Sequence, residues 1–184
     1  MSKVFYITPY CEGNIGKGIN ESIEILPDDA WICLRDSDTL FLTPLQQKQI
    51  QDIVDKNPEY DLLGCRTNRL KSQCQAIYDM FWEDSILKHI QVAKERETLY
   101  YGDITPLPEK EVVAGMFMLF RKSLWNKFKF QEHSIQFDMI LSEQIKNSGG
   151  KLGICEGIYL FHLYRYEAEN PFIEIDHILN CHKF

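Results

Sequence analysis

Two aspartates one residue apart, Asp36 and Asp38, form the group with the clearest chemical potential in this sequence. They follow directly on the short apolar run 31–34. Carboxylate oxygens are preferred ligands of Mg²⁺ and Mn²⁺, and such a cation can neutralise the charge of a diphosphate. The pair therefore predicts a divalent-cation site at the end of a strand. The alternative is a structural turn, in which one aspartate caps a helix that begins at Pro44.

Two further side chains could complete this site. His162 lies in the apolar run 158–165, where a neutral imidazole opposite two carboxylates would make a mixed site suited to Mn²⁺ or Mg²⁺. A strand histidine can equally be a satisfied core residue. Asp138 begins an amphipathic helical pattern. It is either a helix N-cap or a carboxylate, held on a rigid helix start, that accepts a proton from a hydroxyl group.

Other residues near strand ends could also contact a ligand. Arg66, Arg69 and Arg165 lie in loops after expected strands, where they could bind phosphate or sugar groups or simply be solvated surface charges. Gly115 lies inside an expected strand. Glycine at such a position indicates a bulge or the close approach of a ligand.

Short apolar strands alternate with amphipathic helices along the chain, which predicts an α/β fold. The first two strands are expected to be parallel, with the first one buried, because a helix connects them by a crossover. Ligands of such sheets bind outside the carboxyl ends of the strands. Thr8 and the acidic triplet Asp36-Ser37-Asp38 both lie at such ends. Strands are expected at 4–8, 31–34, 62–65, 112–120 and 152–163. Helices are expected at 15–26, from Pro44 to near Asn57, and at 138–147, with one broken helix or two helices over 72–95.

Length and composition are those of one globular domain spanning residues 1–184, with 45% apolar and 26% charged residues. The net charge is −7 and no block of Lys or Arg occurs, so nucleic acid is not an expected partner. No apolar run approaches the roughly 18 residues of a membrane span. The six cysteines show no paired spacing, and we expect reduced thiols in a cytoplasmic protein.

The order of these motifs resembles the family 2 glycosyltransferases over about residues 3 to 165. The resemblance implies a single-domain GT-A fold with a mixed, mostly parallel sheet flanked by helices. The nucleotide-binding part would span about 1–70 and the acceptor-binding part about 110–165. The segments that carry the resemblance are Thr8-Pro9-Tyr10, the stretch 14–20, the stretch 31–41, the stretch 113–125, Phe137-Asp138, and the strand that ends at 162–165.

The resemblance also implies an activity, the transfer of a sugar from a nucleoside diphosphate to a hydroxyl group of a glycan, lipid-linked or protein acceptor. Mn²⁺ or Mg²⁺ would be held by Asp36, Asp38 and His162, and Asp36 could also contact the donor ribose. Asp138 would be the general base of an inverting displacement. The other donor-binding residues would be Thr8, Tyr10, Asn20, Arg69 and Arg165, of which the first two would line the base pocket with Asn20 near it.

The sequence departs from the family pattern at three places. Arg35 precedes the acidic triplet where the family usually has an apolar residue, and Gln136 stands where the family has a second acid close to Asp138. The stretch 127–130 replaces the usual Gly-Gly-Phe.

Two other interpretations stay open. The run 36–40 also resembles the opening motif of haloacid dehalogenase-type phosphatases, in which Asp36 would be the nucleophile and Asp38 the acid/base. That motif should follow the first strand and needs a later acidic pair, for which Asp103 is the nearest candidate. A nucleotide-binding protein without catalytic activity is the third possibility.

Overall fold

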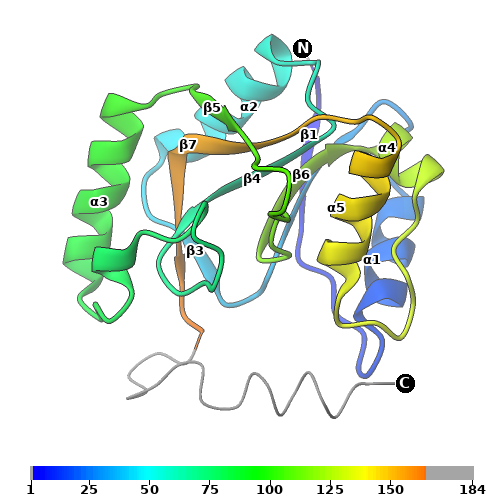
Figure 1. Ribbon diagram of the computed structural model, residues 1–184, viewed down its shortest axis with the longest axis horizontal. Helices are drawn as coiled ribbons and strands as arrows, with labels where there is room; N and C mark the ends of the chain where they lie inside the picture. The colour runs from blue at the N-terminus through cyan, green and yellow to red at the C-terminus, as the bar shows by residue number, and fades with distance from the viewer. Residues whose placement is uncertain (1, 165–184) are drawn as a thin grey trace.

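A seven-stranded mixed sheet forms the centre of the computed structural model, which describes residues 2–164 (Figure 1). The strands are β1 (Val4–Ile7), β2 (Trp31–Arg35), β3 (Thr39–Phe41), β4 (Leu62–Thr67), β5 (Ile104–Pro106), β6 (Phe117–Arg121) and β7 (Leu152–His162). The helices are α1 (Ile15–Glu24), α2 (Leu45–Lys56), α3 (Ile86–Leu99), α4 (Lys122–Lys127) and α5 (Phe137–Asn147), with a 3₁₀ turn at Tyr78–Met80.

The strand order is β1-β2-β6-β4-β7-β3, and β5 also pairs with β7. β1 with β2 and β4 with β7 are parallel pairs, whereas the other four pairs among the described strands are antiparallel. The α/β class and the parallel β1–β2 pair are confirmed, but the expectation of a mostly parallel sheet is wrong. β6 lies between β2 and β4 and runs antiparallel to both, and the short strands β3 and β5 each run antiparallel to β7.

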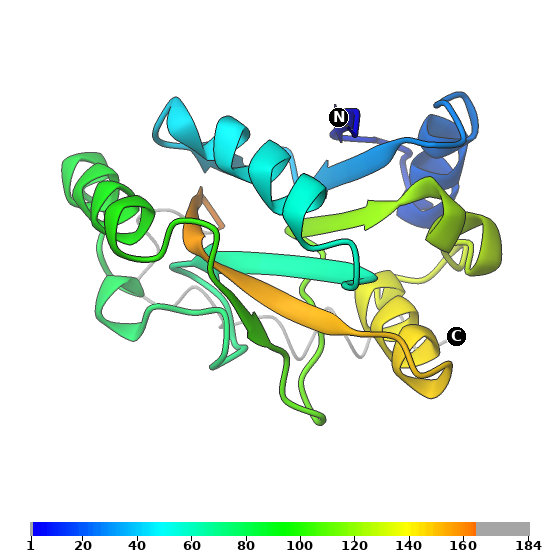
Figure 2. The same cartoon turned by 90° about the horizontal axis from the view of Figure 1, so that it is seen from above.

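Alternating side chains of the central strands divide the core into two layers. Trp31 and Cys33 of β2 pack with residues of α2, whereas Ile32 and Leu34 pack with residues of α1 and α5. Figures 1 and 2 show α2 apart from the group formed by α1, α4 and α5, while α3 runs beside β7 at the other end of the molecule. β6 comes from the expected acceptor-binding part, yet it lies between β2 and β4 of the expected nucleotide-binding part.

Tertiary hydrogen bonds override local preference in two segments. The expected helix over 72–95 is wrong in its first part, because the backbone at 75–77 bonds to Thr67 at the end of β4 and α3 begins only at Ile86. The expected strand over 112–120 begins only at Phe117. Its first residues donate their backbone N–H groups to side chains instead: Val113 to Ser142, Ala114 to Gln75 and Gly115 to Asp138.

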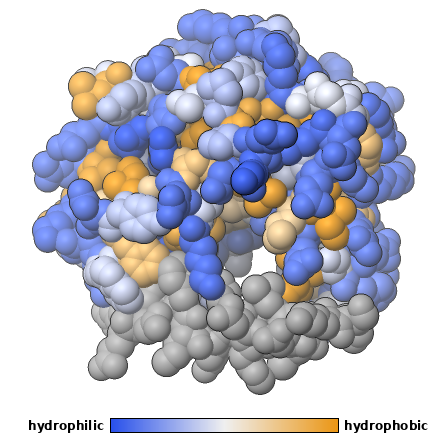
Figure 3. All heavy atoms as spheres, in the orientation of Figure 1, coloured by the Kyte–Doolittle hydropathy of each residue, from blue (hydrophilic) through white to orange (hydrophobic). Residues whose placement is uncertain are grey.

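β1 is an edge strand rather than a buried one, and its Tyr6 side chain is exposed. Sequence periodicity also missed β3, β5 and α4. The first two are three-residue strands, too short for a periodic pattern. The face seen in Figure 3 is predominantly hydrophilic, with hydrophobic residues in separate patches. None of the helices in the described part of the chain is long and apolar enough to cross a membrane.

Candidate metal-binding and carboxylate site

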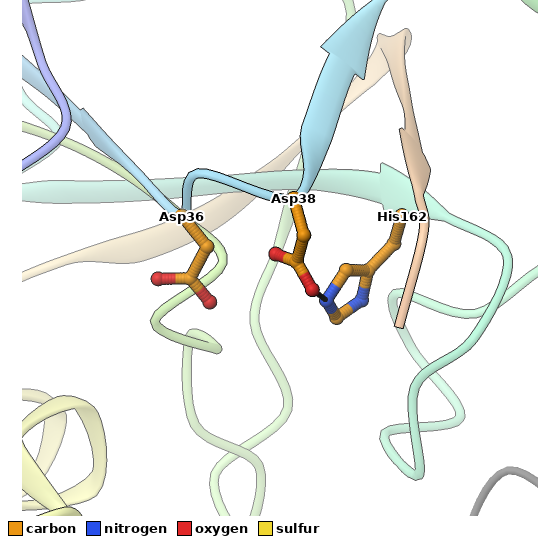
Figure 4. Close-up of side chains that lie close together, drawn as sticks. All are labelled: Asp36, Asp38 and His162. Carbon is orange, nitrogen blue, oxygen red and sulfur yellow. Dashed lines mark ion pairs between the residues drawn. The ribbon is translucent and has the colours of Figure 1, made fainter. Parts of the chain in front are cut away.

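Three potential metal ligands meet at the end of β2. Asp36, Asp38 and His162 each offer one ligand atom, and these atoms all lie within 4.8 Å of one another. Nε2 of His162 lies 3.4 Å from Oδ2 of Asp38. Figure 4 shows the two carboxylates entering the same space, with the imidazole ring beside Asp38. The structure therefore brings together the three residues that the sequence assigned to a metal.

The short strand β3 brings His162 to the acidic triplet. Thr39 of β3 is the register partner of His162 in β7, and the Leu163 N–H donates to the Asp38 carbonyl at 2.8 Å. The hydroxyl of Thr39 donates to the Asp36 carbonyl at 2.8 Å, which closes the turn. Arg35 donates to the Thr39 carbonyl at 2.6 Å. This arginine, which departs from the family pattern, thus braces the turn that carries the two aspartates.

The hydrogen bonds of His162 prepare its Nε2 atom for a cation. Its Nδ1 lies 3.1 Å from the carbonyl oxygen of Arg69, and a carbonyl can only accept, so Nδ1 carries the hydrogen. Nε2 is then the ring atom that faces Asp38. It donates to the carboxylate when the ring carries a second hydrogen, and it offers its lone pair to a cation when it does not, the arrangement usual for metal-bound histidines. Asn68 holds the backbone of His162, accepting from its N–H at 2.8 Å and donating to its carbonyl at 3.1 Å. His162 is buried, but it is directed at the acidic pair rather than into the core.

Asp138 lines the same cavity, which has a volume of about 360 Å³. Its Oδ2 accepts from the Gly115 N–H and its Oδ1 from the Met139 N–H, both at 2.8 Å. The N-cap of α5 is Gln136, so the interpretation of Asp138 as a plain N-cap is wrong. A larger cavity of about 890 Å³ lies around Tyr60 and the end of α5, and none of the three carboxylates lines it.

The neighbours of Gly115 in the protein explain why no larger residue fits at this position. A Cβ atom at this position would lie 2.6 Å from Cζ of Phe137 and 3.4 Å from Cβ of Asp138. The group that approaches Gly115 is therefore the start of α5. The expectation of a bulge is wrong, because Gly115 precedes β6 rather than lying inside it. Gly115 also lines the cavity, so the close approach of a ligand stays a prediction.

The carboxylates of the cavity differ in their electrostatics. Burial, and then repulsion by Asp38 and Asp138, raises the pKa of Asp36 to about 6, although His162 opposes the shift. The Asp36 side chain reaches solvent at the cavity mouth, yet protein atoms surround it densely enough to weaken its hydration. The hydrogen bond from His162 lowers the pKa of Asp38. Burial raises the pKa of Asp138 in spite of its backbone hydrogen bonds.

The structure gives the arginines of the polar loop protein partners. Arg69 lies in the cavity wall, but its guanidinium is buried and bonds to the Phe81 carbonyl and to Asp84. Arg66 forms a two-pronged pair with Glu156, through bonds of 2.8 and 2.7 Å. The guanidinium groups of Arg69 and Arg66 are therefore both bonded to other groups of the protein.

The other expected donor contacts do not line the cavity. Thr8 and Tyr10 are exposed residues after β1, and Asn20 bonds to Trp125 and Phe130. Arg165 lies outside the described residues. Asp103, the acid that a phosphatase would need, is not among the lining residues either.

Sequence reasoning missed Asn68 and the bracing role of Arg35. Both lie at the carboxyl ends of strands, which is the available signal, but polar residues are common there. Chemically, two carboxylates and an imidazole with a directed lone pair can hold a divalent cation, and a third carboxylate of raised pKa can accept a proton nearby. Comparison with known sequences adds no assignment, because no protein-family model and no curated protein matches the chain.

Proposed function

We propose that this protein is a metal-dependent glycosyltransferase that moves a sugar from a nucleoside diphosphate to a hydroxyl group of an acceptor. The observation that carries the proposal is one cavity in which Asp36, Asp38 and His162 cluster together with Asp138. The two sets of groups match the two tasks of such a transfer, which are to bind a diphosphate leaving group and to deprotonate an acceptor.

The chain's residues divide these tasks. Asp36, Asp38 and His162 would hold Mn²⁺ or Mg²⁺, which when bound supplies positive charge to the leaving diphosphate. Asp138 accepts the proton of the acceptor hydroxyl as the new bond from that oxygen to the sugar forms and the bond to the diphosphate breaks. Its raised pKa makes it a stronger base than an ordinary carboxylate. The Gly115 N–H orients this carboxylate at the cavity wall.

The first test is metal-dependent nucleotide binding. We expect Mn²⁺ together with UDP or GDP to raise the melting temperature of the protein, because the metal joins the diphosphate to the folded state. Asp38→Ala should abolish this shift, since it removes a ligand and the partner of His162. The matched variant Asp29→Ala, at an exposed aspartate outside the cavity, should keep it. An equal shift in Asp38→Ala, or none in the unaltered protein, would contradict the proposal.

A second test separates transfer from the two alternatives. Asp138→Asn should keep the metal-dependent shift but lose transfer from a screened nucleoside-diphosphate sugar by roughly 100-fold or more. A protein that only binds nucleotide would show no transfer in any screen. Hydrolysis of a generic phosphate ester that stops in Asp36→Asn would identify a phosphatase instead.

A further inference from the structure

Helix α1 is attached to the segment that leads into α5 by two asparagines of the stretch 14–20. Asn20 binds both backbone groups of Phe130, donating to its carbonyl at 2.9 Å and accepting from its N–H at 3.1 Å. The same Asn20 oxygen accepts from Nε1 of Trp125 at 2.9 Å. Both polar groups of the Asn20 amide are thereby aimed at α4 and at the chain that connects it with α5.

The attachment continues toward the start of α1. The Asn14 side chain caps α1 at the Lys17 N–H and also accepts from the His133 N–H at 2.9 Å. Between these two asparagines, a Cβ atom at Gly16 would collide with the backbone carbonyl of Gln131. The first part of α1 and the segment 130–133 are thus in direct contact. We call Asn14, Gly16 and Asn20 the α1 clamp.

A line of packed residues connects the α1 clamp to Asp138. The Phe130 ring is buried and contacts the Phe137 ring with centroids 5.8 Å apart. Phe137 fills the space beside Gly115, where no Cβ would fit. The Gly115 N–H in turn holds the Asp138 carboxylate at 2.8 Å. Movement of Phe130 therefore reaches Asp138 through contacts between neighbouring groups.

We infer that Asn20 is a positioning residue for Asp138, acting through Phe130 and Phe137 rather than touching a ligand. The expected effect of Asn20 on kcat rests on the proposed function, to which the inference adds a residue that positions the proton acceptor. The resemblance to glycosyltransferases placed Asn20 near the base of the donor, whereas its contacts assign it to the helix that carries the proton acceptor. The metal ligands sit on β7 and the turn after β2, so disturbing the clamp leaves them in place.

The test compares Asn20→Ala with Asn57→Ala, which also removes one asparagine at a helix but near the end of α2. In Asn20→Ala we expect kcat for transfer to fall roughly 10- to 100-fold, because the carboxylate is misplaced. The KM for the donor and the melting-temperature shift with Mn²⁺ and UDP or GDP should stay unchanged. Hydrogen exchange at the Gly115 amide should accelerate, since its bond to Asp138 weakens. Asn57→Ala should alter neither kcat nor that exchange rate.

A milder variant guards against misfolding of Asn20→Ala. Asn20→Ser keeps a hydroxyl group that can both donate and accept, but on a shorter side chain that cannot make all the bonds of Asn20, so intermediate effects on kcat and exchange are expected. Loss of the Mn²⁺-dependent shift in either variant would place Asn20 at the donor and overturn the inference. An unchanged rate of hydrogen exchange at the Gly115 amide in both variants would also overturn the inference. This measurement requires no enzymatic activity, so it tests the positioning role of Asn20 even if the protein proves not to be a transferase.

Discussion

The charge of Asp36 destabilises the folded protein while no cation is bound. Burial and the neighbouring carboxylates raise its pKa from 3.8 to about 6, so the folded state holds the proton more tightly than the unfolded state. The stabilisation from protonation is complete below the unfolded value and is lost as the pH rises through about 6. Loss of folding stability at a functional site is common where function requires several like charges close together.

Replacing this carboxylate by a neutral isostere should therefore stabilise the metal-free protein at high pH. We expect Asp36→Asn in EDTA to raise the melting temperature at pH 8 by about 2–4 °C, which corresponds to roughly 1 kcal/mol of unfolding free energy at this chain length. This free energy is smaller than the pKa shift alone would imply, because solvent reaches the Asp36 carboxylate and screens its charge. The gain should vanish near pH 4. Asp29→Asn serves as the control and should be neutral at both values. A gain equal at pH 4 and pH 8 would show that charge is not the cause.

At the scale of elements, the site depends on how strand β7 is held at its end. β3 pairs with β7 on one side, and on the other the Asn68 amide continues the β4–β7 ladder by bonding to both backbone groups of His162. Asn68 is fully buried, so water cannot replace it without rearrangement. The orientation of His162 toward Asp38 is therefore a property of three strands together.

Removal of the Asn68 amide should cost both stability and metal affinity. Asn68→Ala leaves the backbone groups of His162 without their side-chain partner, for which we expect a loss of about 2 kcal/mol in the free energy of unfolding by urea. Mn²⁺ affinity measured by titration calorimetry should fall about 10-fold or more, as for other residues that support a metal ligand. Asn57→Ala should leave Mn²⁺ affinity unchanged. Unaltered affinity in Asn68→Ala would argue against His162 as a ligand.

At the scale of the whole molecule, a buried ion network joins β4, β7 and α3 away from the candidate site. Glu156 accepts from Arg66 and from Arg96, the latter at 2.5 Å. Burial alone would raise the pKa of Glu156, but hydrogen bonds from Arg66 and Thr105 and the charges of both arginines outweigh it, and the pKa is lowered. Its contribution to stability is thus present above the ordinary value of 4.5 and is lost as the pH falls through the lower folded value.

Breaking this network should destabilise the fold without affecting the site. Glu156→Gln leaves two largely buried guanidinium groups without their counter-charge, and we expect a loss of about 3–5 kcal/mol in unfolding by urea at pH 7. The loss should shrink as the pH falls well below 4.5, where Glu156 itself becomes protonated. The melting-temperature shift with Mn²⁺ and nucleotide should persist. Should the shift disappear as well, the network would be coupled to the cavity.

Features that depend on residues close together in the chain are predictable from the sequence. Ile15, Ile19 and Ile23 recur at helical spacing directly after Asn14, the N-cap of α1, so this helix is predictable from neighbouring residues. The apolar run 31–34 predicted β2, and the order of elements predicted the parallel β1–β2 pair. The acidic triplet at the strand end followed from the same reasoning. These are local signals, because helix and strand periodicities are contained within a few turns or residues of chain.

Which of these groups meet depends on contacts between distant parts of the chain. His162 reaches Asp38 through the register of β3 with β7, and Gly115 reaches Asp138 because residues 113–115 bond to side chains instead of to a strand. Asn20 was expected near the donor and instead holds the chain before α5. Each outcome depends on partners about 20 to 120 residues apart in sequence, and strand register and side-chain hydrogen bonds at that distance leave no periodic trace in the chain.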